Sequence, residues 1–171
     1  MNNSALLIAT LLLMPAPVNS RAQAATGASP SPAAQEKTHV TQHAAGTFEV
    51  KMAPQKPDNE VAQAANIGRF SSDKVFHGDL EATSKGEMLA AGDPKVSAGY
   101  VAMERVTGSL KGRKGSFVLQ HSGTMTRGVP ALSITVVPDS GTEELKGLSG
   151  KMKIIIAADG KHSYEFDYSL E

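Results

Sequence analysis

The stretch GSFVLQHSGTM, residues 115–125, alternates strictly between two kinds of side chain. Phe117, Leu119 and His121 share one face, and the opposite face carries Val118, Gln120 and Ser122. A period of two residues is typical of a β-strand with one buried face. Because His121 continues the apolar face, we expect either a histidine satisfied within the core or one that lines a cavity.

The same period recurs along the chain. We expect strands at residues 46–52, 69–89 (one or two strands), 97–110, 115–125, 130–138, 151–158 and 162–170. The Asp-Gly turn at 159–161 joins the last two strands as a hairpin. Residues 53–68 and 141–150 are expected to be loops with at most a helical turn.

This arrangement predicts an all-β fold. Roughly eight regularly spaced strands without a long helical period indicate an antiparallel sandwich or a closed barrel. Long strands favour the barrel, because closure leaves no exposed sheet edge. We therefore predict a single antiparallel, roughly eight-stranded closed β-barrel.

The amino-acid composition excludes or disfavours several classes of function. The 171 residues include 17 basic and 17 acidic side chains, a balance that does not favour a nucleic-acid partner or an anionic membrane surface. There is no cysteine, which excludes disulfides, thiol catalysis and cysteine-based metal sites.

The N-terminus predicts export. Residues 5–18 are apolar but too short to span a bilayer comfortably, and Ala22 and Ala24 form the small-x-small pattern that precedes signal-peptidase cleavage. We predict a signal peptide at 1–24, cut between Ala24 and Ala25, and a periplasmic or secreted protein without a membrane contact after cleavage. An uncleaved membrane anchor is the alternative, since residues 1–4 contain no Lys or Arg.

The mature chain is predicted to have two parts. Residues 25–45 are rich in Ala, Ser, Pro and Thr without a regular period, which is typical of a disordered linker. Residues 46–171 are predicted to form the barrel domain.

Three charged or titratable residues fall on faces that the alternation assigns to the interior. Lys74 precedes Phe76, Glu104 follows Tyr100, and His121 follows Leu119. Isolated buried charges are costly, so these groups should either form ion pairs or hydrogen bonds with one another or remain hydrated. One interpretation is a satisfied Glu–Lys or Glu–His pair that fixes the strand register, and the other is a polar patch in an apolar cavity.

If the cavity exists, we expect eight residues to line it, with Phe48, Ile134 and Phe166 as further walls. The candidates are Lys74, Phe76, Ser84, Tyr100, Glu104, Phe117, Leu119 and His121.

No metal or cofactor is expected. The sequence lacks a P-loop, a G-x-S-x-G motif, an H-E-x-x-H motif and a G-x-G-x-x-G motif. His77, Asp79 and Glu81 alternate along one strand, a pattern that solvated faces show routinely. His39 and His43 lie four residues apart in the linker, where the spacing is expected to be incidental.

Five stretches together resemble a bacterial family of domains of unknown function. They are GTFEVKM (46–52), KVFHGDLEATSKGEML (74–89), AGYVAMERVTGSLKGRKGSFVLQHSGTM (98–125), LSITVVPDSGTEELKGLSGKM (132–152) and GKHSYEFDYSL (160–170). The members of that family form small, calycin-like β-barrels similar to allene oxide cyclase. The resemblance covers Gly46 to Leu170 and implies a central cavity. It implies no activity, and the catalytic motif of the plant cyclase has no matching stretch here.

Three functions follow as hypotheses. The first is an exported barrel that binds a small apolar ligand in its cavity. The second is an isomerase or cyclase acting on a lipid-derived substrate, with Glu104 and His121 as the acid–base pair. The third is a non-catalytic module whose barrels associate through their outer faces as a homo-oligomer.

Overall fold

The computed structural model describes residues 40–171. The predicted signal peptide, its cleavage site, His39 and most of the predicted linker lie outside the described residues. The predicted start of the domain at residue 46 was placed too late, because β1 already begins at Gln42. Residues 42–45 pair with the last strand, and Ala44 is fully buried.

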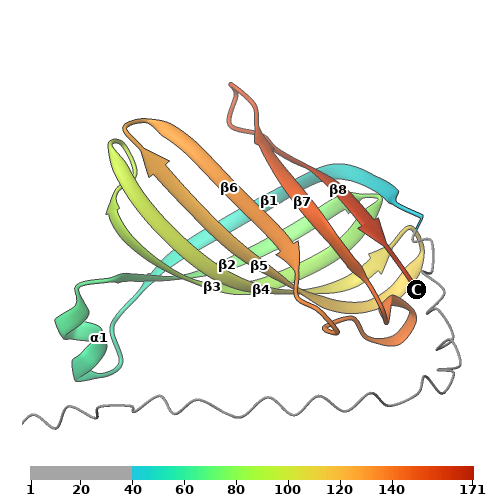
Figure 1. Cartoon of the computed structure of the whole chain (residues 1–171), viewed down its shortest axis with the longest axis horizontal. Helices are drawn as coiled ribbons and strands as arrows, with labels where there is room; N and C mark the ends of the chain where they lie inside the picture. Colours follow the sequence, from blue (N-terminus) through green and yellow to red (C-terminus); the bar gives the residue numbers. More distant parts are fainter. Residues whose placement is uncertain (1–39) are drawn as a thin grey trace, which may run out of the picture. The chain divides into compact units, whose positions relative to one another are not determined.

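The described residues form one closed antiparallel barrel in which each strand pairs with the next and the last pairs with the first (Figure 1). Its strands are β1 (Gln42–Gln55), β2 (Gly68–Gly78), β3 (Leu80–Asp93), β4 (Ser97–Leu110), β5 (Arg113–Thr126), β6 (Val129–Val136), β7 (Ser149–Ile156) and β8 (His162–Ser169). This confirms the predicted all-β, eight-stranded closed barrel.

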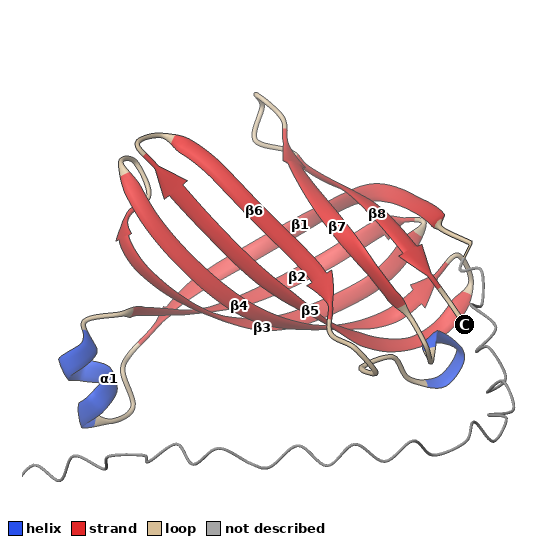
Figure 2. Ribbon diagram, viewed as in Figure 1, coloured by secondary structure: helices blue, strands red, loops and turns tan. Residues whose placement is uncertain are grey.

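Within residues 40–171, helical structure is confined to two short segments (Figure 2). α1 (Glu60–Ala65) begins after Asn59, whose side chain accepts a hydrogen bond from the Ala62 amide at 2.8 Å. The 3₁₀ turn η1 (Glu143–Leu145) lies between β6 and β7. Both fall in the ranges where a helical turn was predicted. No helix of residues 40–171 combines the length and the apolar character that crossing a bilayer requires.

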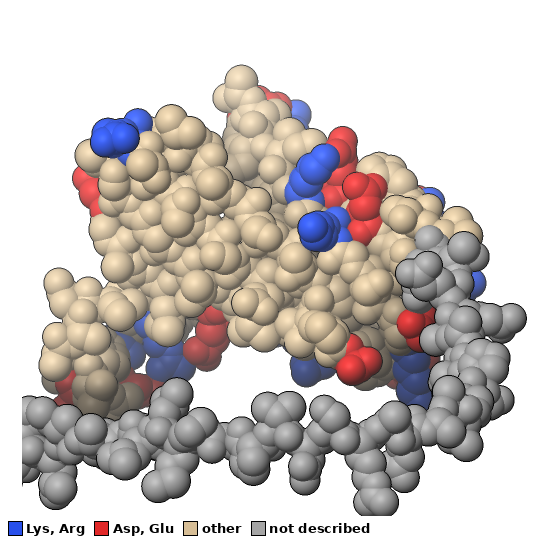
Figure 3. All heavy atoms as spheres, in the orientation of Figure 1, with Lys and Arg blue, Asp and Glu red and all other residues tan. Residues whose placement is uncertain are grey.

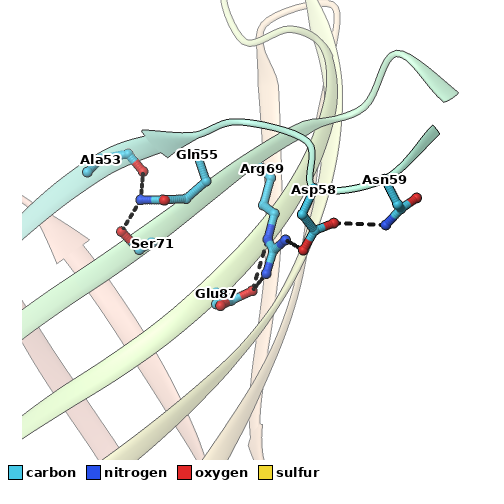
Figure 4. A network of polar contacts seen from close by, with 7 residues as sticks. All are labelled: Ala53, Gln55, Asp58, Asn59, Arg69, Ser71 and Glu87. Atoms are coloured by element: carbon cyan, nitrogen blue, oxygen red, sulfur yellow. Dashed lines mark hydrogen bonds and ion pairs between the residues drawn. The ribbon is translucent and has the colours of Figure 1, made fainter. Parts of the chain in front are cut away.

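An ionic network fastens α1 to the barrel (Figure 4). The guanidinium of Arg69, at the start of β2, donates to Glu87 on β3 and to Asp58 just before the helix, at 2.8 and 2.6 Å. The hydrogen bond from Arg69 lowers the pKa of Asp58. Because one guanidinium bridges two carboxylates, it holds the long β1–β2 connection at the end of the barrel that carries the β3–β4, β5–β6 and β7–β8 turns.

The opposite end of the barrel is packed solid. Inward side chains there are large and buried, and Leu145 of η1 closes the end from outside the strands. Phe117 and Phe166 stack at 5.9 Å between ring centroids, and Phe76 meets Tyr164 edge-on at 5.7 Å. Most of the buried apolar core therefore occupies one half of the barrel.

Toward the end that carries the hairpin turns, the inward positions are less filled. Met52, Leu132 and Ile156 point inward by the alternation of their strands, yet each stays largely exposed. The barrel is thus a cup, closed at the η1 end and open at the α1 end.

Removing the side chain that closes the cup tests this packing. Leu145→Ala should lower the free energy of unfolding by about 2–5 kcal/mol, because Leu145 is 1% exposed and its loss leaves a cavity. Urea denaturation measures the change. Leu89→Ala on the outer wall, where the side chain is 48% exposed, is the control and should cost less than about 1 kcal/mol. Equal losses in the two variants would contradict the closed end.

Candidate functional site

The open half of the barrel contains two adjoining cavities that share Met88, Tyr100 and Leu132. The outer cavity, of about 720 Å³, is lined by β2 to β6 and mainly by apolar or small side chains. The inner cavity, of about 220 Å³, reaches deeper and includes residues of β1, β7 and β8. It is lined by Phe48, Val50, Met52, Ser72, Lys74, Met88, Tyr100, Ala102, Glu104, His121, Leu132, Ile154, Ile156 and His162.

A polar cluster forms the floor of the inner cavity. Lys74 Nζ donates to Glu104 Oε2 at 2.6 Å, and Ser84 Oγ donates to Glu104 Oε1 at 2.5 Å. His121 Nε2 lies 2.9 Å from Glu104 Oε2. All four residues are buried, and they come from four consecutive strands, β2 to β5.

Strand register brings these residues together. Lys74 pairs with Ser84 across β2 and β3, and Glu104 lies opposite Gly86 and Leu119 on the two strands that flank β4. His121 is opposite Ala102, one inward position along β4 from Glu104. The cluster is therefore a set of direct and diagonal cross-strand neighbours on the inner wall.

The surroundings of Glu104 favour its ionised form, since they lower the pKa of its carboxyl. Burial alone would raise the pKa of its carboxyl, but the contacts with His121, Lys74 and Ser84 together lower it to about 2. Lys74 also lies over the rings of Phe48 and Phe76, at 5.2 and 5.8 Å from their centroids. The ammonium is thus held by one carboxylate and two aromatic faces.

His121 is the incompletely satisfied member of the cluster. Although its Nε2 atom is close to Glu104, the contact lacks hydrogen-bond geometry, and within residues 40–171 this buried atom has no hydrogen-bond partner. A buried ring nitrogen without a hydrogen bond is costly, and here the adjacent carboxylate of Glu104 offsets part of that cost through its charge.

Tyr100 adds a hydroxyl to the wall above the cluster. Its ring lies against Gly123 on β5, where an added Cβ would come within 2.2 Å of the ring. The absence of a side chain at Gly123 therefore makes room for the tyrosine. Burial and the charge of Glu104 raise the pKa of Tyr100, so the phenol stays protonated and can donate a hydrogen bond.

The structure separates the predicted lining residues into three groups. Lys74, Tyr100, Glu104 and His121 line the inner cavity, as does the predicted wall residue Phe48. Ser84 lies behind Glu104 as its hydrogen-bond donor. The others are buried core residues outside the lining of either cavity: Phe76, Phe117, Leu119, Ile134 and Phe166.

Sequence reasoning missed several lining residues from the open half. Met88, Ile154, Ile156 and His162 all fall on inward positions of their strands. The alternation alone could have indicated them, combined with their closeness to the hairpin turns at the open end.

Of the histidines considered for metal binding, the two that the structure describes, His43 and His77, lie outside the cavity. His77 is exposed beside Glu49 and Glu81, at 3.5 and 3.7 Å, and Asp79 instead accepts a hydrogen bond from the Ala45 amide. His43 contacts Asp167 at 2.7 Å. No group of three or more His, Cys, Asp or Glu side chains in the described part of the chain is arranged to hold a metal ion.

Comparisons place the chain among proteins of unknown activity. The model of a family described as "Protein of unknown function (DUF3224)" matches residues 44–168. A crystal structure of a protein of unknown function from the DUF3224 family of Shewanella oneidensis MR-1 is similar at 47% identity, with a TM-score of 0.70. The alignment covers 77% of this chain and 98% of that chain. No curated protein matches the sequence.

The lowered pKa of Glu104 predicts an acid-sensitive contribution to stability. The pKa of Glu104 has its ordinary value of 4.5 in the unfolded chain and a value of about 2 in the folded barrel. Between pH 2 and 4.5, unfolding is therefore accompanied by the uptake of a proton. The ionised Glu104 should thus add about 3 kcal/mol to the free energy of unfolding. This contribution is complete above pH 4.5 and is lost as the pH falls through about 2. Urea denaturation over pH 2 to 6 measures it.

Glu104→Gln should lack this component of the pH dependence. Glu165→Gln, at an exposed carboxylate 3.9 Å from Lys153, is the control and should follow the wild type. If the wild type and Glu104→Gln showed parallel pH dependence, Glu104 would not be ionised within the folded barrel as described.

Proposed function

The chain belongs to the DUF3224 family of proteins of unknown function, and we propose that it binds one small, mostly apolar molecule in the open half of its barrel. The outer cavity, of about 720 Å³, suits a small ligand, since such pockets span roughly 300–1,000 Å³, and the inner cavity of about 220 Å³ extends it toward the polar floor. The mostly apolar lining around a few convergent polar groups is the usual composition of such a pocket.

The observation that carries the proposal is the polar floor beneath an apolar cavity. A buried ion pair is weak support for stability alone, because apolar residues of similar volume often replace such a pair without loss. Here the pair lies at the bottom of an open cavity, beside a histidine nitrogen without a hydrogen bond. A polar group of the ligand would hydrogen-bond to the imidazole of His121, which lines the cavity.

The charges of the floor limit the chemistry of the ligand. Lys74 and Glu104 neutralise each other at 2.6 Å, so their pair offers no net charge to a highly charged molecule. His121 and the protonated hydroxyl of Tyr100 remain to bind it. We infer that the polar end of the ligand is a hydroxyl, a carbonyl or a single acidic group and that the rest is hydrocarbon.

Acid–base catalysis by Glu104 and His121 is the second candidate, and their 2.9 Å contact is the observation that favours it. The low pKa of Glu104 disfavours an acid–base role for this carboxylate, because efficient catalysts have a pKa near the working pH. In such an enzyme His121 would carry the proton and Glu104 would orient its ring. His121→Ala would then abolish turnover, whereas a pure binder would lose only affinity.

We further propose that the protein is exported, with residues 1–24 as a signal peptide cut between Ala24 and Ala25, to the periplasm or the outside of the cell. The apolar segment 5–18 and the small residues at 22 and 24 support this. We also propose that the barrel is similar in architecture to allene oxide cyclase, on the basis of its eight antiparallel strands around a cavity. This similarity concerns architecture, and no catalytic residue is carried over.

Filling the cavity tests the proposed function. Ala102 lines the inner cavity, whereas its neighbour Val101 is 54% exposed and lies on the outer wall. We expect the wild type to bind the fluorescent apolar probe N-phenyl-1-naphthylamine, and Ala102→Trp to weaken binding at least about tenfold because the indole occupies the cavity. Val101→Trp is the matched control and should bind as the wild type does.

Fluorescence titration gives the affinities, and circular dichroism checks that each variant folds. Equal binding by Ala102→Trp and Val101→Trp would place the probe outside the barrel. A wild type that binds neither this probe nor any component of a lipid extract, tested by native mass spectrometry, would end the binding proposal.

A further inference from the structure

The wall of the barrel is weakest between β6 and β7. Within the described chain only two residue pairs join these strands, Ile134 with Met152 and Thr135 with Lys151. By contrast, β6 pairs with β5, and β7 with β8, along their full lengths. We call the gap that remains between Val129–Ser133 of β6 and Lys153–Ile156 of β7 the seam.

The two strands diverge from their pairing toward the open end of the cup (Figure 1). If the register continued, Ser133 would lie opposite Lys153 and Leu132 opposite Ile154, but these pairs are not formed. In Figure 3 a notch separates the tips of the β5–β6 and β7–β8 hairpins. The main-chain edges that line the seam therefore face each other without a ladder between them.

The seam is unusually apolar for a pair of sheet edges. Natural edges are commonly protected by charged side chains or proline, and Lys153 and Pro130 are residues of that kind here. Around them Leu132 is 46% exposed and Ile156 is 64% exposed, with Val129 and Ile155 exposed as well. An apolar opening of this kind suits the passage of an apolar molecule.

The inner cavity lies directly behind the seam. Leu132 from one edge and Ile154 and Ile156 from the other line the same cavity as Glu104 and His121. A molecule that entered between β6 and β7 would therefore pass the apolar side chains of Leu132, Ile154 and Ile156 on its way to the polar floor.

We propose that apolar ligands enter and leave this cavity sideways, through the seam between β6 and β7. The inference rests on the proposed binding function. Widening the seam disturbs only the two pairs at its base, whereas every other junction of the wall is a long ladder whose opening would break many hydrogen bonds. Opening the barrel wall at the seam therefore costs fewer hydrogen bonds than opening it between any other two strands.

The absence of cysteine allows a direct test with a single engineered disulfide. Ser133→Cys combined with Lys153→Cys can form a disulfide only when the two edges approach, since Cα atoms in disulfides lie within about 7 Å. The oxidised form therefore holds the seam closed. Thr135→Cys with Lys151→Cys is the matched control, because these positions are already paired and their disulfide leaves the seam unchanged.

Stopped-flow fluorescence with N-phenyl-1-naphthylamine gives the rates of association and dissociation. In the oxidised Ser133→Cys/Lys153→Cys protein we expect both rates to fall by at least about tenfold, because the probe loses its lateral path. Reduction should restore them, and the oxidised control should match the wild type. If the disulfide does not form, Leu132→Trp, which fills the seam from one edge, should slow both rates in the same direction.

Unchanged rates in the closed-seam protein would overturn the lateral route and direct entry to the end of the barrel, while leaving ligand binding intact. A wild type that fails to bind the probe would instead overturn the proposed function, and the lateral route with it. The two failures are distinguished by the equilibrium titration of the wild type.

Discussion

The interior of an eight-stranded barrel is only just wide enough to be filled by side chains, and this constraint governs the rest of the structure. Where the inward residues are large, as at Phe76, Phe117 and Phe166, the interior is solid. Where they are small, as at Ala90, Ala98 and Ala102, the same wall encloses empty space. The cup results from this unequal distribution of side-chain volume along the barrel axis.

The polar cluster lies at the boundary between the two halves, and its position explains its composition. Glu104 is too deeply buried to be hydrated, so it needs Lys74 and Ser84 as donors from two other strands. His121 Nε2 lies 2.9 Å from the same carboxylate without hydrogen-bond geometry. The cluster is therefore bonded through Glu104 on its packed side, while Lys74, Glu104 and His121 also line the inner cavity.

Access to such a site conflicts with the stability of its wall. A fully paired barrel removes every sheet edge but leaves only its ends for entry. Here η1 and the core close one end, the α1 end stays open, and the pairing of β6 with β7 stops after two residue pairs. The molecule thus keeps most of its ladder and concentrates the unpaired main chain next to the cavity, where an opening can serve the ligand.

The sequence by itself determined the strands and the set of inward residues, because alternation is a local property that each strand shows independently. For that reason Lys74, Ser84, Glu104 and His121 were all assigned to the interior correctly. The choice of a closed barrel over a sandwich rested on the length of the strands instead. Tertiary structure alone decided which inward residues face empty space: Phe117 and Leu119 are packed, whereas Met88 and Ile156 line the cavity. That choice depends on the height of each residue along the barrel axis, which is fixed by the register between strands and by the segment that closes one end, and neither is written in the pattern of any single strand.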